Sequence, residues 1–186
     1  MEKEQIKQYL ENLAKDCPNF IKSRLKEGDL VDRYKIDDIN LHKQLGDFPK
    51  GSVPYAAIRN KLKGSWIDRN KITCKYEKDI PFSDMLKNET GVCLEKAIMV
   101  QLAAQEGRDS YLIDGYMADK SDNYTLGIPH GYNVIFKDDK PYVVDAENPI
   151  RAEGKEIPYI VPIIDIEKNK IIVSDECKHE REYFLF

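Results

Sequence analysis

Cysteine and histidine are scarce in this chain, and long apolar runs are absent. The four cysteines stand far apart in 186 residues without a Cys-x-x-Cys pair, which argues against a disulfide framework and a paired zinc motif. The longest apolar stretches fall well short of the roughly 20 residues that cross a bilayer. The opening MEKEQIKQYLENLAKD mixes acids with bases, unlike a secretion signal. We therefore expect a cytoplasmic protein with no membrane partner.

An excess of positive charge is also lacking. The 29 basic and 33 acidic residues are spread along the chain and give a net charge of −4. A phosphate-binding surface requires clustered positive charge, so we expect no nucleic-acid partner. Hydrophobic residues make up 41% of the chain, enough for the core of one domain of this length.

Hydrophobic periodicity predicts helices in the first half of the chain and strands in the second. We expect an amphipathic helix over 3–16, short helices within 20–26, 39–45 and 55–62, a strand over 71–76 and a buried helix that begins after Thr90. Further strands are predicted over 110–116, 131–136, 141–146, 157–166 and 170–174, and the final REYFLF is expected to add an edge strand.

This order predicts an α+β fold in which a buried central helix packs on an antiparallel sheet. It argues against the alternating pattern of a dinucleotide-binding protein. We divide the chain into a helical N-terminal segment, residues 1–65, packed on a core of residues 66–186 that ends in a β-hairpin. The segment 1–65 could instead dock a partner or regulate the core.

Cys93 is the first candidate for chemistry because it lies at the start of the predicted buried helix. With Thr90 as the N-cap, Cys93 is the third helical residue, and its N–H can donate to an oxyanion that forms beside its sulfur. The helix terminus contributes only about 0.3–1 kcal/mol toward the thiolate. A histidine must therefore help to activate the sulfur.

Of the three histidines, only His130 has a context that suggests a role. It opens the predicted strand GYNVIF, which a polar turn joins to PYVVDA. If the hairpin turns at residues 138 and 139, residues whose numbers sum to 277 lie opposite each other, and His130 lies diagonal to Asp145 on one face. A shift of register by one residue would separate them. The order Cys, His, Asp matches an acyl-transfer triad.

Residues 82–149 resemble the transglutaminase-like superfamily, which has a papain-like catalytic core. TGVCLEKAIMVQLAAQEG is similar to the family's Gly-x-Cys helix, LIDGY to its strand ending in Gly-Tyr, HGYNVIF to its histidine motif, and YVVDAENP to the strand that carries its aspartate. The resemblance implies that Cys93 is the nucleophile, His130 the general base and acid, and Asp145 the residue that orients the imidazole.

The chain departs from the family motif after the histidine and after the aspartate. Tyr132 stands where the family usually has Trp, and Ala146-Glu147 stand where it often has Pro-Thr. The family also supplies a second oxyanion donor from upstream of the cysteine. Trp66 and Asn88 are the candidates for that donor here.

We therefore expect a cysteine-dependent acyl-transfer enzyme that hydrolyses an amide or peptide bond, as a peptidase, amidase or deamidase. One alternative is transfer to an amine, as in a transglutaminase or in the arylamine N-acetyltransferases. The sequence CLE at residues 93–95 partly matches the Cys-aromatic-Glu motif of the arylamine N-acetyltransferases. Another is a non-catalytic binding module. The expected substrate is a peptide or protein, with a small amide as the alternative. No cofactor or metal is expected, because Cys177 and His179 offer only two ligands.

Overall fold

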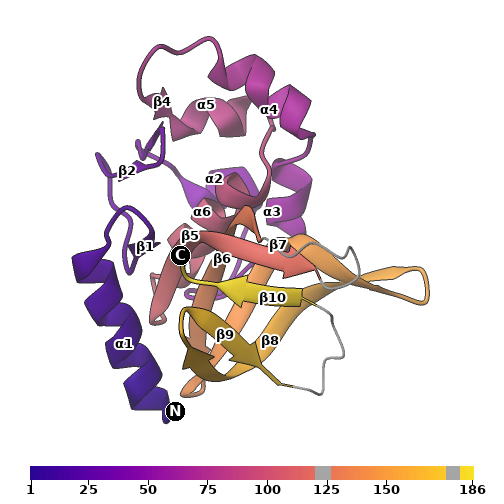
Figure 1. The fold of residues 1–186 in the computed structure, drawn as a ribbon. Helices are drawn as coiled ribbons and strands as arrows, with labels where there is room; N and C mark the ends of the chain where they lie inside the picture. Colours follow the sequence, from indigo (N-terminus) through magenta and orange to yellow (C-terminus); the bar gives the residue numbers. More distant parts are fainter. Residues whose placement is uncertain (120–126, 175–180) are drawn as a thin grey trace.

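The computed structural model describes residues 1–119, 127–174 and 181–186 (Figure 1). The helices are α1 (Lys3–Asp16), α2 (Leu41–Leu45), α3 (Tyr55–Lys61), α4 (Trp66–Thr73), α5 (Phe82–Lys87) and α6 (Cys93–Ala104). The strands are β1 (Ile21–Lys22), β2 (Leu30–Val31), β3 (Tyr34–Lys35), β4 (Ile80–Pro81), β5 (Ser110–Asp119), β6 (Ile128–Lys137), β7 (Lys140–Ala152), β8 (Lys155–Glu167), β9 (Lys170–Val173) and β10 (Arg181–Phe184).

Six antiparallel strands form a closed barrel. Their order around the barrel is β5, β10, β9, β8, β7 and β6, and β6 pairs again with β5 to close it. Strand β1 adds a seventh strand beside β5. The predicted fold class, a transglutaminase-like or papain-like α+β core with a central helix packed on an antiparallel sheet, is therefore wrong.

The C-terminal strand is the reason for this error. We expected REYFLF to form an edge strand, but β10 lies between β5 and β9. Its Tyr183 pairs with Met117 on one side and with Ile171 on the other. The alternating pattern of a strand does not reveal whether it has one neighbour or two. Strand β5, one of the two neighbours of β10, is distant in sequence, so the position of β10 between them could not be predicted from its own residues. The pairing of β6 with β5 joins the two ends of the six-stranded order.

Two local predictions in the first half are also wrong. Residues 71–76, expected as a strand, form none, and the first three belong to α4. Ser65 and Asp68 cap one another and start a helix upstream that continues through Thr73. Residues 20–26, expected as a helix, contain β1 instead, because Ile21 pairs with Ile113 of the barrel. In both places a capping or tertiary interaction outweighs the local pattern.

The apolar residues form two clusters, one inside the barrel and one between the barrel and the helices. The inner cluster includes Tyr132, Val134 and Val143. The outer cluster packs α6 against the outer surface of β5, β6 and β7. In Figure 1 the helices α2 to α5 gather on one side of the barrel, while α1 runs along another. No helix in the described part of the chain is both long enough and apolar enough to span a membrane.

Candidate active site

His130 and Asp145 meet at one end of the barrel, on neighbouring strands. The predicted register is confirmed, since Asn133 pairs with Val144 and Val134 pairs with Val143. Strand alternation then turns His130 and Asp145 toward the barrel interior. The His130 Nε2 atom lies 2.9 Å from Oδ2 of Asp145, and the two residues are only 3% and 0% exposed.

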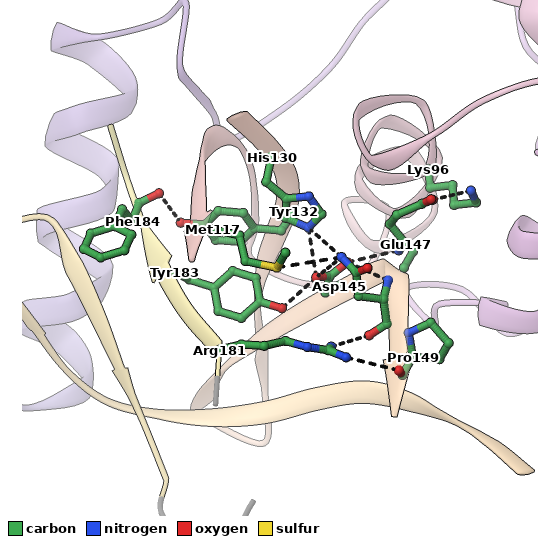
Figure 2. A network of polar contacts seen from close by, with 12 residues as sticks. Lys96, Met117, His130, Tyr132, Asp145, Glu147, Pro149, Arg181, Tyr183 and Phe184 are labelled. Carbon is green, nitrogen blue, oxygen red and sulfur yellow. Dashed lines mark hydrogen bonds and ion pairs between the residues drawn. The ribbon is translucent and has the colours of Figure 1, made fainter. Parts of the chain in front are cut away.

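Asp145 accepts hydrogen bonds on both of its carboxylate oxygens (Figure 2). Oδ1 accepts from the backbone N–H groups of Glu147 and Asn148, at 3.0 and 3.1 Å. Oδ2 accepts from the Tyr183 hydroxyl at 2.6 Å and from the Asn148 side chain at 3.2 Å, in addition to its contact with His130. Burial opposes ionisation of Asp145, but these donors and the charge of His130 outweigh it and lower its pKa.

Cys93 lies at the first helical position of α6, not at the third as predicted. Val92 is the N-cap residue, and its N–H donates to the Glu95 carboxylate at 2.8 Å. Thr90 is not the cap, because its hydroxyl donates to the Asn88 carbonyl and its backbone bridges to Lys63. The Cys93 N–H has no acceptor within the described residues, so it remains free to bind an oxyanion.

Gly131 allows this helix start to approach the histidine strand. A Cβ atom at Gly131 would lie 2.7 Å from the Leu94 Cα and 3.1 Å from the Leu94 backbone nitrogen. Only a residue without a side chain permits that contact between β6 and the first turn of α6. Since Leu94 follows Cys93 and Gly131 follows His130, the close approach brings the thiol and the imidazole together.

The His130 ring therefore interacts with both other members of the predicted triad. Burial opposes its ionisation, but the charge and hydrogen bond of Asp145, together with the nearby Cys93, raise the pKa of His130 to about 10. Nε2 faces Asp145, which leaves Nδ1 for the thiol. The three residues that the sequence selected are thus brought to one place. Cys93 is itself only 7% exposed.

A second polar group, not foreseen from the sequence, lies beside the nucleophile. Glu95 is fully buried one residue beyond Leu94, and it contacts the Arg69 guanidinium at 2.6 Å and the Tyr34 hydroxyl. The Arg69 guanidinium lies 5.7 Å from the centre of the Tyr34 ring. The buried carboxylate is thus satisfied by a cation, a phenol and the Val92 N–H. These contacts fix the turn that carries Cys93.

Asp114 faces the same region from β5, where it pairs with Gly131. Burial and the charge of Asp32 raise its pKa, whereas Arg69 and His130 act in the opposite direction. Its carboxylate has no hydrogen-bond or ion-pair partner within the described ranges. It had not been selected from the sequence, because only the strand pairing places it beside Gly131.

Asn88 and Trp66, the candidates for the second oxyanion donor, have other contacts in the structure. Asn88 donates its side-chain amide to the Asp84 carbonyl at 2.7 Å, and Trp66 is 55% exposed beneath the Arg69 guanidinium. Neither is assigned as an oxyanion donor. Cys177 and His179 lie outside the described residues. Within the described part of the chain, no cluster of three or more histidine, cysteine or acidic side chains could hold a metal ion.

Comparisons with protein-family models, with curated proteins and with solved structures found no match.

Proposed function

We propose that the protein is a cysteine-dependent hydrolase that cleaves an amide or peptide bond through a thioester on Cys93. The observation that carries the proposal is the position of His130, whose Nε2 atom lies 2.9 Å from Asp145 and whose strand closely approaches the helix start that carries Cys93. A thiol, an imidazole and an orienting carboxylate in this order can perform acyl transfer. The resemblance of residues 82–149 to the transglutaminase-like superfamily supports the same chemistry.

In the first half-reaction the Cys93 thiolate attacks the carbonyl carbon of the amide. The resulting oxyanion accepts a hydrogen bond from the backbone N–H of Cys93 at the start of α6. The carbon–nitrogen bond then breaks, and His130 gives its proton to the departing amine. Asp145 keeps the imidazole oriented and stabilises its positive charge throughout this step.

In the second half-reaction water attacks the thioester. His130 accepts a proton from that water, the carbon–sulfur bond breaks, and the Cys93 thiolate is released together with a carboxylic acid. If an amine replaces water, the same steps form a new amide. Hydrolysis is our proposal, and transfer to an amine is an outcome of the test.

Acylation by p-nitrophenyl acetate tests the nucleophile without knowledge of the natural substrate. We expect a burst of about one nitrophenolate per protein chain, followed by slow turnover. Cys93→Ala should abolish the burst, and the control Cys74→Ala, which alters an exposed thiol, should retain it. A folded protein without a burst, or a Cys93→Ala variant that keeps one, would contradict the proposal.

A non-catalytic binding module is the main alternative. The low exposure of Cys93, 7%, is the observation that favours it, since a reactant must reach the sulfur. Alkylation by iodoacetamide at pH 7, with each cysteine followed by peptide mass spectrometry, separates the two functions. The hydrolase requires Cys93 to react faster than Cys17 and Cys74, whereas a blocked thiol would react more slowly than either.

A further inference from the structure

We propose that Lys96 is a positioning residue, which acts through Glu147 to set the spacing between Cys93 and the His130–Asp145 pair. This inference rests on the proposed function. Lys96 lies one helical turn after Cys93 on the same side of α6 and is only 5% exposed. Figure 2 shows its side chain extending from α6 to Glu147.

The ammonium group of Lys96 joins the segment before the nucleophile to the segment after the acid. Its Nζ donates to the Gly91 carbonyl at 3.1 Å and forms an ion pair with the Glu147 carboxylate. The Glu147 backbone N–H donates in turn to Oδ1 of Asp145 at 3.0 Å. The Lys96 side chain thereby connects the segment before Cys93 with the turn that follows Asp145.

Arg59 strengthens the same connection from α3. Its guanidinium donates to the backbone carbonyls of Ala146 and Glu147, at 2.8 and 2.9 Å. The turn after Asp145 is therefore held by two cations from the helical side and by Arg181 of β10, which donates to the Asn148 carbonyl. Arg59 also pairs with the Glu156 carboxylate at 3.4 Å, but within the described residues none of its contacts is to the segment before Cys93. Lys96 is therefore the contact that also reaches the nucleophile segment.

A buried lysine is costly unless it is paired, and an ion pair of this kind gives little net stability. A pair of apolar or neutral side chains would serve the packing equally well. Lys96 and Glu147 instead supply a fixed distance between two segments that belong to different parts of the fold. The imidazolium and the thiolate require such a distance, because their attraction falls as they separate.

The titration of the His130 ring, followed by NMR, tests this role without any substrate. Lys96→Met and Glu147→Gln should each lower the midpoint of His130 by about one pH unit, which is a tenfold loss of proton affinity. Glu147 is partly exposed, so its variant should fold even if Lys96→Met does not. Lys7→Met, which breaks the ion pair of Lys7 with Asp109, is the control and should leave the midpoint unchanged.

The double variant Lys96→Met/Glu147→Gln separates positioning from a merely structural role. Removing both partners should return the thermal stability close to that of the wild type, because no uncompensated charge remains. If Lys96 positions the site, the His130 midpoint stays low. Recovery of that midpoint together with stability, or an unchanged midpoint in both single variants, would overturn the inference. Failure of the proposed function would appear separately, as a wild-type protein without a nitrophenolate burst.

Discussion

The Nε2 atom of His130 lies 2.9 Å from Oδ2 of Asp145, inside a barrel end where both residues are almost fully buried. The two groups stabilise one another in their charged forms. Water reaches neither of them readily, so the loss of one partner leaves the other uncompensated. The site is therefore expected to be sensitive, in stability as well as in activity, to any change at this pair.

Asp145→Asn should lower the free energy of unfolding by about 3–5 kcal/mol, the range for breaking a buried pair. It should also abolish the nitrophenolate burst, because the imidazole loses the charge that orients and stabilises it. Urea denaturation and burst kinetics measure the two effects. Asp138→Asn, at the exposed turn of the same hairpin, is the control and should change neither. Full burst amplitude in folded Asp145→Asn would contradict the assignment of Asp145.

Tyr183→Phe should destabilise the protein by about 1.5–3 kcal/mol, because it removes a hydrogen bond to a charged group. The lost contact is the 2.6 Å bond from the Tyr183 hydroxyl to Asp145. The burst should be slower and still present, since His130, Asn148 and two backbone N–H groups remain on the carboxylate.

Tyr142→Phe is the matched control for this change. Its hydroxyl makes no hydrogen bond within the described ranges, although Tyr142 lies on the same strand as Asp145. Urea denaturation of the two variants isolates the contribution of the Asp145 contact. Equal stability of the two variants would show that the hydrogen bond from Tyr183 to Asp145 does not stabilise the protein.

The contact between His130 and Asp145 could be predicted because it depends on a local hairpin. Asp138 and Asp139 both adopt positive φ, 48° and 63°, in a two-residue turn that fixes the register of β6 and β7. Once that register is set, strand alternation determines which residues share a face. The short range of this information is why the sequence was sufficient.

Barrel closure and the shell around the site could not be predicted for the opposite reason. Tyr183 reaches Asp145 only because β10 pairs with β5, whose residues lie more than 60 positions earlier in the chain. The contacts of Glu95 with Arg69 and Tyr34 also join distant parts of the sequence, 26 and 61 positions apart. The only feature of the sequence that drew attention to Glu147 was that Ala146-Glu147 replace the Pro-Thr of the family motif. No periodicity encodes such pairings.

Gly131→Ala should reduce the rate of the burst by roughly 100-fold, the cost of about 1 Å of misplacement. The new Cβ would lie 2.7 Å from the Leu94 Cα, so α6 must move away from β6 and take Cys93 with it. Overpacking should also cost about 1–3 kcal/mol of stability. Gly154→Ala is the control, since its φ of +74° makes alanine strained while nothing lies within 4 Å. A burst rate equal to that of the control would contradict the role given to Gly131.

The stability that His130 contributes should fall as the pH rises. Its pKa is about 10 in the folded protein and about 6.5 in the unfolded chain. Between these values the folded state retains a proton that the unfolded state has released, so the free energy of unfolding decreases with pH. The contribution is complete below about pH 6.5 and lost near pH 10.

His130→Gln removes the titrating group, so its free energy of unfolding should be lower and should depend less on pH. Urea denaturation at several pH values should therefore show a gap between wild type and variant that is widest near pH 6 and narrows toward pH 10, whereas a gap that stays constant would mean that the imidazole is buried in its neutral form.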